Sequence, residues 1–93
     1  MVGTMAEARR VLVVDDEPTI AGSVAVRLRA EGYAVEVAHD GPGAVAAVAE
    51  HRPDLVVLDI MLPGFDGIEV CRRIQADRPV AVLMLTGRDA ETD

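Results

Sequence analysis

Three aspartates lie at the ends of two apolar segments. Of all the residues in this sequence, these three are the best suited to chemistry, because they are carboxylates and because of their spacing. Asp15 and Asp16 directly follow the run Val11–Val14, and Asp59 ends the run Asp54–Asp59. If the two runs are adjacent parallel strands, their carboxyl ends meet at one edge of a sheet, where such folds bind ligands. Like charges ~4 Å apart repel by about 4 kcal/mol at an effective dielectric constant near 20. The cluster therefore calls for protonation, a basic partner or a bound cation.

A divalent cation is the favoured of these three. The sequence contains no Lys, and the segments around the aspartates carry little Arg. Mg²⁺ binds one or two carboxylates, keeps several waters and shares phosphate oxygens with a substrate. Such a site can organise phosphoryl transfer, which depends mainly on positioning and charge neutralisation. One of the aspartates could itself be the nucleophile and form an aspartyl phosphate.

Simpler interpretations of the same residues remain open. Asp15 and Asp16 could serve only to begin a helix at Pro18, because acidic side chains favour helix N-termini. Asp59, taken alone, could cap a turn. Thr86 could be an ordinary β-branched strand residue. Each residue has such an alternative, so the functional interpretation depends on the residues being considered together.

Short apolar runs alternate with amphipathic segments, which predicts a parallel sheet covered by helices on both faces. The four expected strands are Val11–Val14, Ala34–Val37, Asp54–Asp59 and Val80–Leu85. The three expected helices run from Pro18 to a stop at Gly32, from about Gly43 to His51, and onward from Asp66. Asp40 is expected to cap the second helix, and Asp66 with Glu69 has the spacing of a capping box. The predicted fold class is α/β with a doubly wound sheet.

Helical spacing also indicates which side chains face the core. The expected apolar positions are Ile20, Val24 and Leu28 in the first helix and Ile68, Cys71 and Ile74 in the third. The strand expected at 80–85 is apolar on every side, which is typical of an interior strand.

Length and composition restrict the class of protein. The chain has 93 residues, 51% of them hydrophobic and 27% charged, which indicates one small globular domain rather than a disordered chain. The formal net charge of −7 argues against a nucleic-acid-binding surface. The single cysteine, Cys71, excludes an internal disulfide and fits the reducing cytoplasm.

The remaining sequence features are less specific. No segment approaches the ~20 apolar residues that a membrane span requires. Residues 1–9 lack a signal-peptide pattern and are expected to form a flexible tail. His39 and His51 have no partners at ligand spacing and are expected at the surface.

Three motifs together resemble the receiver domain of bacterial two-component response regulators. They are Val13–Pro18 (VVDDEP), Asp59–Gly64 (DIMLPG) and Leu83–Arg88 (LMLTGR). Asp59 lies 43 residues after Asp16 and 27 residues before Thr86, which is also similar to the family. The resemblance runs from about residue 10 to residue 93. It implies a flavodoxin-like sheet in which the strands, numbered along the chain, have the spatial order 2-1-3-4, an order for which receiver domains are a known example.

The resemblance implies a role for each motif residue. Asp59 would be the phosphoacceptor, taking a phosphoryl group from the phosphohistidine of a sensor histidine kinase. Asp16 would bind Mg²⁺ directly, Asp15 mainly through water, and Met61 through its backbone carbonyl. Thr86 would be the switch hydroxyl that turns toward the phosphoryl oxygens. Such a domain would assist only its own phosphorylation and dephosphorylation. The residues of its motifs are most similar to those of regulators with a winged-helix DNA-binding output.

The sequence also departs from the family pattern. Receivers continue with a helix, a fifth strand bearing a Lys and a closing helix, whereas this sequence stops at Asp93. Residues 10–93 are therefore expected to be a truncated receiver, with self-association through an exposed fourth strand. Two alternatives remain: a fragment without signalling activity, and an Asp-based metal-dependent phosphohydrolase. Haloacid-dehalogenase-like phosphatases place a second Asp two residues after the nucleophile, and Met61 stands at that position here.

Overall fold

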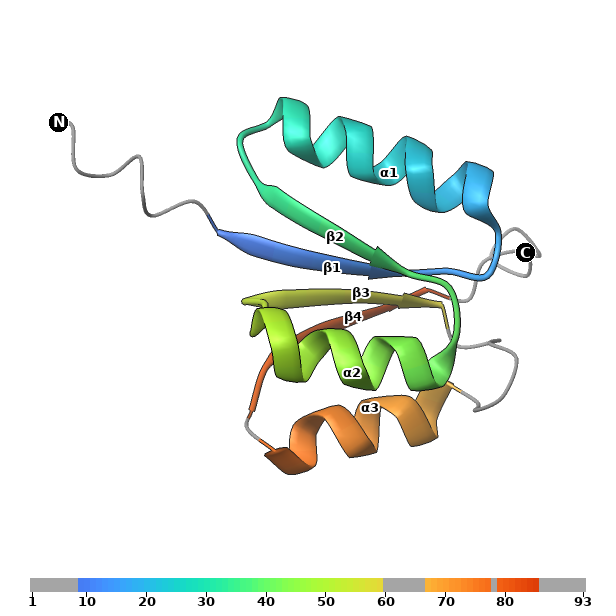
Figure 1. Cartoon of the computed structure of the whole chain (residues 1–93), viewed down its shortest axis with the longest axis vertical. Helices are drawn as coiled ribbons and strands as arrows, with labels where there is room; N and C mark the ends of the chain where they lie inside the picture. The colour runs from blue at the N-terminus through green and yellow to red at the C-terminus, as the bar shows by residue number, and fades with distance from the viewer. Residues whose placement is uncertain (1–8, 60–66, 78, 86–93) are drawn as a thin grey trace, which may run out of the picture.

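The computed structural model describes residues 9–59, 67–77 and 79–85 of the chain. These residues form four parallel strands and three helices in strict alternation (Figure 1). The strands are β1 (Arg10–Val14), β2 (Ala34–Ala38), β3 (Leu55–Asp59) and β4 (Ala81–Leu85). The helices are α1 (Pro18–Ala30), α2 (Gly41–His51) and α3 (Gly67–Asp77). The strand order is β2-β1-β3-β4, so the predicted doubly wound sheet of order 2-1-3-4 is confirmed.

Alternating side chains of the strands build a core on each face of the sheet. On β1, Leu12 and Val14 enter a cluster with buried residues of α2 and α3, among them Val48 and Ile74. Val11 and Val13 point to the opposite face, into a second cluster that includes residues of α1. Successive side chains of a strand point to opposite faces, which is why a continuously apolar strand needs helices on both sides. Figure 1 shows α1 on one side of the sheet and α2 with α3 on the other.

The helix ends follow local sequence signals. Pro18 begins α1, and Gly32, with φ of 101°, lies just beyond its end in a left-handed conformation that glycine adopts readily. The Asp40 carboxylate caps α2 as predicted, because its Oδ1 accepts a hydrogen bond from the Gly43 N–H at 2.7 Å. A Cβ at residue 43 would lie 2.9 Å from that oxygen, so glycine permits the close approach. The cap sets the start of α2 at Gly41, two residues earlier than expected.

Two predicted core positions were wrong. Ile68 of α3 is 66% exposed and Ile20 of α1 is 52% exposed. In α3, Ile74 is buried as predicted and Cys71 is half-buried, but Val70 is buried in place of Ile68. In α1 the buried side chains are Ala21 and Ala25, and their small size lets the helix pack closely on the sheet.

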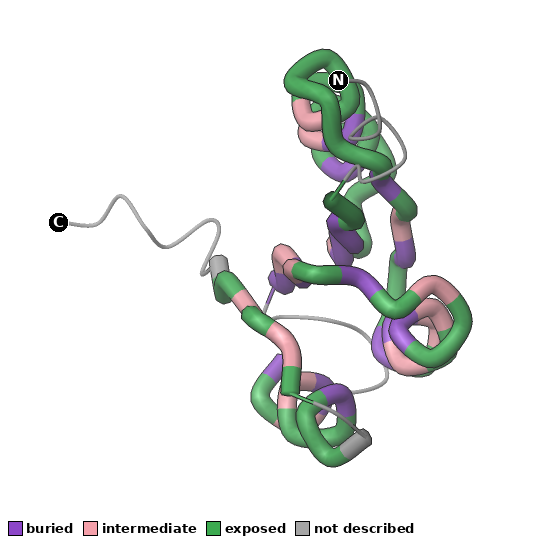
Figure 2. Tube along the Cα trace, turned by 90° about the vertical axis from the view of Figure 1, so that its left-hand side faces the viewer, coloured by how far each residue is buried: buried purple, intermediate pink, exposed green. Residues whose placement is uncertain are grey.

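The strand β4 lies at one edge of the described sheet. Leu83 is 52% exposed and Met84 is 36% exposed, and Figure 2 shows β4 as a mixture of exposed and half-buried residues. These apolar side chains are accessible for contact with another surface. Self-association through this strand stays a prediction.

Among the described residues, none of the helices combines the length and the apolar character needed to cross a bilayer.

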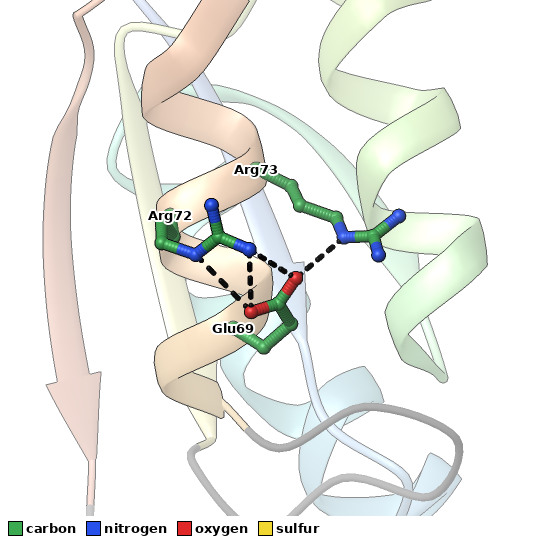
Figure 3. A network of polar contacts seen from close by, with 3 residues as sticks. All are labelled: Glu69, Arg72 and Arg73. Atoms are coloured by element: carbon green, nitrogen blue, oxygen red, sulfur yellow. Dashed lines mark hydrogen bonds and ion pairs between the residues drawn. The ribbon is translucent and has the colours of Figure 1, made fainter.

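A cluster of charges stabilises the outer surface of α3 (Figure 3). Arg72 donates hydrogen bonds to both carboxylate oxygens of Glu69, with Nη2 at 2.9 and 2.8 Å. Arg73 donates from Nε to Glu69 Oε2 at 2.8 Å. The hydrogen bond from Arg73, followed by that from Arg72, lowers the pKa of Glu69 from its ordinary 4.5. Glu69 also lies in the first turn of α3, where a negative charge favours the helix.

Replacement of Ile74 by Ala is expected to destabilise the fold much more than the same replacement at Ile68. Ile74 is 1% exposed, so Ile74→Ala removes buried apolar surface and should cost about 2–5 kcal/mol in the free energy of unfolding. Ile68→Ala, on the same helix, should change it by less than about 0.5 kcal/mol. Urea unfolding followed by circular dichroism measures both. Equal losses in the two variants would contradict this assignment of the core.

The pKa of Glu69 should rise toward 4.5 in the variant Arg73→Gln, because Arg73 is the largest cause of the lowering. The folded pKa lies below the unfolded value, so the stabilisation from ionised Glu69 is present above pH 4.5 and is lost as pH falls through the folded pKa. Carboxyl NMR titration measures the value directly. Arg27→Gln, which alters a separate ion pair on α1, is the control and should leave Glu69 unchanged.

Candidate functional site

The pairing of β1 with β3 brings the three aspartates to one edge of the sheet. The two strands are parallel neighbours, and their last paired residues are Val14 and Leu58. The next residues along each strand are Asp15 and Asp59, which therefore lie at the same level. Asp15, Asp16 and Asp59 each offer a carboxylate oxygen within 4.8 Å of the others. The structure thus brings together the three side chains on which the sequence analysis depends.

The three carboxylates differ in their exposure to solvent. Asp59 is buried, with 6% of its surface exposed, whereas Asp15 is half-buried and Asp16 is exposed. Burial removes the water that would otherwise stabilise the charge of Asp59, so a neighbouring positive charge would be worth more there than at the surface. Asp16 is therefore the member of the cluster that is most accessible to solvent.

Hydrogen bonds hold Asp15 at three of its atoms. Its backbone N–H donates to the carbonyl of Ala38 at 3.1 Å, which continues the ladder between β1 and β2. Its Oδ1 accepts from the backbone N–H of Glu17 at 2.9 Å. Its carbonyl oxygen lies 3.1 Å from Nδ1 of His39. The loop that carries Asp15 and Asp16 is therefore fixed by β2 on one side and by the start of α1 on the other.

His39 is a residue of this site that the sequence analysis missed. The prediction that it lies at the surface is correct, since its side chain is exposed, but its contact with Asp15 was not foreseen. The signal for this contact was its position. His39 directly follows β2, which neighbours β1, and the register that pairs Val14 with Ala38 puts His39 level with Asp15.

The donor set fits a small, hard divalent cation. All three groups are carboxylates, which suit Mg²⁺, whereas sites for softer metals are rich in thiolate or imidazole. Mg²⁺ holds its oxygens at about 2.0–2.1 Å, so oxygens on opposite sides of the ion are about 4 Å apart. Neighbouring ligand oxygens of the ion are closer, about 3 Å apart. Ligand atoms within 4.8 Å of one another are therefore near enough to share one ion once their side chains turn toward it.

Two predicted site residues lie outside the described part of the chain. Met61 falls in residues 60–66 and Thr86 in residues 86–93. Their roles as a carbonyl ligand and a switch hydroxyl stay predictions. Asp66, the expected partner of Glu69 in a capping box, also lies outside the described residues.

Comparison with known proteins relates the chain to one family and to several solved structures. The family model of the response regulator receiver domain matches residues 11–93. A CheY-like response regulator receiver domain protein from Methanospirillum hungatei is 32% identical with a TM-score of 0.81, over 83% of this chain and 62% of that chain. The response regulator domain of Thermotoga maritima CheB is 33% identical with a TM-score of 0.78, over 83% and 59% of the two chains.

A third similar structure carries a different description. It is a two-component response regulator of the LuxR family from an Aurantimonas species, 38% identical with a TM-score of 0.74, over 83% of this chain and 57% of that chain. This chain spans 57–62% of the length of these three solved chains.

Asp16→Asn is expected to raise the melting temperature by a few degrees in the absence of divalent cations, because it removes one of three neighbouring negative charges. Mg²⁺ at 100 times its Kd should stabilise the unmodified chain by about 2.7 kcal/mol and the variant by much less. Thermal unfolding with EDTA and with Mg²⁺ measures both effects. Glu50→Gln, an exposed change of the same charge on α2, should leave the response to Mg²⁺ intact. Identical responses in Asp16→Asn and the unmodified chain would argue against a cation at the cluster.

Proposed function

The chain belongs to the response regulator receiver domain family, and on that premise we propose that it accepts a phosphoryl group on Asp59 in a Mg²⁺-dependent reaction. The observation that carries the proposal is the position of Asp59. It is a buried carboxylate at the end of β3, with carboxylate oxygens of Asp15 and Asp16 within 4.8 Å. A nucleophile beside two further carboxylates is well arranged for a reaction that needs a cation.

The transfer itself requires little covalent chemistry from the protein. A carboxylate oxygen of Asp59 attacks the phosphorus of a phosphohistidine, and the bond between phosphorus and the imidazole nitrogen breaks as the new P–O bond forms. The electron pair of the broken bond stays on the imidazole nitrogen of the donor.

Asp15 and Asp16 would hold the cation, with Asp59 contributing an oxygen and Met61 its backbone carbonyl. Bound Mg²⁺ supplies charge neutralisation for the carboxylates and the incoming phosphoryl oxygens. Asp16, the exposed member, would bind it directly, and Asp15 mainly through water. We further propose that Thr86 supplies a hydroxyl that turns toward the phosphoryl group. These assignments follow the motif positions of the family.

We propose a sensor histidine kinase as the phosphodonor and the cytoplasm as the location of the reaction, where an unpaired Cys71 stays reduced. We also propose a DNA-binding winged-helix output, because the residues of the motifs around Asp59 and Thr86 are similar to those of regulators with such an output. The receiver would not act as an enzyme on other substrates. The phosphohydrolase alternative has no support in the family match, and the general acid it needs would stand where the sequence has Met61.

Asp59→Asn should abolish phosphorylation by acetyl phosphate in the presence of Mg²⁺, because an amide oxygen is a far weaker nucleophile than a carboxylate. Intact mass spectrometry should find one added phosphoryl group on the unmodified chain and none on the variant. EDTA should reduce the labelling strongly. Asp54→Asn is the matched control, since Asp54 precedes the opposite end of the same strand and contacts Arg10 instead. Equal labelling of Asp59→Asn and the unmodified chain would refute the phosphoacceptor assignment.

A further inference from the structure

We infer that His39 is a positioning residue for the cation site, an inference that rests on the proposed function. The imidazole Nδ1 of His39 lies 3.1 Å from the carbonyl oxygen of Asp15. This carbonyl belongs to the peptide group that joins Asp15 to Asp16, and a peptide group is planar. A hydrogen bond to it therefore fixes the orientation of the chain on both sides, where the two proposed cation-binding carboxylates are attached.

The imidazole of His39 supplies a hydrogen-bond donor that the backbone of β2 does not provide. In a parallel ladder, a residue donates its N–H to one residue of the neighbouring strand and accepts at its carbonyl from the residue two further on. Asp15 donates to the Ala38 carbonyl, so the regular donor to its own carbonyl would be the N–H of Asp40. However, β2 ends at Ala38 and Asp40 caps α2. The side chain of His39 supplies the donor instead.

The chemistry of the acceptor defines the protonation of this nitrogen. A carbonyl oxygen only accepts hydrogen bonds, so Nδ1 of His39 must carry the hydrogen in the contact. The neutral imidazole with its hydrogen on Nδ1 and the charged imidazolium both donate from that atom. The positioning role therefore does not depend on the charge of His39.

The remaining contacts of Asp15 show why one additional bond matters. The Asp15 N–H and Oδ1 are held by Ala38 and by Glu17, respectively. Neither contact restrains the peptide plane that leads on to Asp16. The bond from His39 does so, and it connects the end of β2 to the exposed carboxylate that the proposed cation would meet first.

Calorimetric titration of the full chain with Mg²⁺ tests the inference. His39→Ala should weaken Mg²⁺ binding by roughly two- to tenfold in Kd, the range expected for one hydrogen bond. His39→Asn should restore most of the affinity, because the Asn side-chain nitrogen lies at nearly the same place as Nδ1 and can donate. His51→Ala is the matched control, since His51 lies at the other end of the sheet, near Glu36, and should leave the affinity unchanged.

A second readout works without metal. Amide hydrogen exchange by NMR should be faster at Asp15 and Glu17 in His39→Ala than in the unmodified chain, and ¹⁵N shifts should identify Nδ1 as the protonated nitrogen of His39. Unchanged exchange together with unchanged Mg²⁺ affinity in His39→Ala would overturn the inference and leave the proposed function standing. If the unmodified chain binds no Mg²⁺, the proposed function fails, and the exchange rates alone decide whether His39 positions the loop.

Discussion

Parallel pairing of β1 with β3 forces like charges together, and much of the structure serves to withstand that repulsion. The register that pairs Val14 with Leu58 leaves Asp15 and Asp59 side by side, and Asp16 completes the cluster. The backbone positions that carry Asp15 and Asp59 cannot move apart without breaking strand pairing or the hydrogen bonds of Asp15. Apolar burial along both strands therefore holds an electrostatically unfavourable arrangement in place. Such an arrangement favours the cation that we propose, since binding one would relieve a repulsion that folding imposes.

The hydrogen bonds of Asp15 come from two directions. Ala38, the last residue of β2, and His39, which follows it, approach from one side, and Glu17, directly before α1, approaches from the other. As a result, the loop after β1 is held from both sides, although Asp16 itself is exposed. In the function that we propose, this support would keep the backbone fixed while the charge of the site changes on uptake of a phosphoryl group.

The strands and the cluster could be predicted because they depend on patterns that are local or nearly so. Continuous apolar runs define β1 and β3, and parallel pairing of adjacent runs brings their ends together whatever the details of packing. The cap at Asp40 could also be predicted, since Asp is a preferred N-cap residue. Roles that depend on Met61 and Thr86 come from resemblance alone, because a backbone carbonyl or a single hydroxyl has no sequence pattern of its own.

Predictions failed where the answer depended on the rotation of a helix or on a contact across strands. Ile68 and Val70 are both apolar, and only the seating of α3 on the sheet decides that Val70 is buried and Ile68 is exposed. His39 has no partner nearby in the sequence. Its contact with Asp15, 24 residues away, arises from the register between β1 and β2, which periodicity does not specify.

The two hydrophobic clusters both include residues of β1. Consecutive side chains of β1 enter opposite clusters, with Leu12 and Val14 on one face and Val11 and Val13 on the other. Loss of either helical layer would expose one side of the same strand, so neither layer can melt without weakening the other. The fold is thus expected to behave as one cooperative unit, and the geometry of the aspartates depends on both layers at once. Disturbance on the α1 side, far from α2 and α3, would reach the carboxylates through the backbone that both clusters hold.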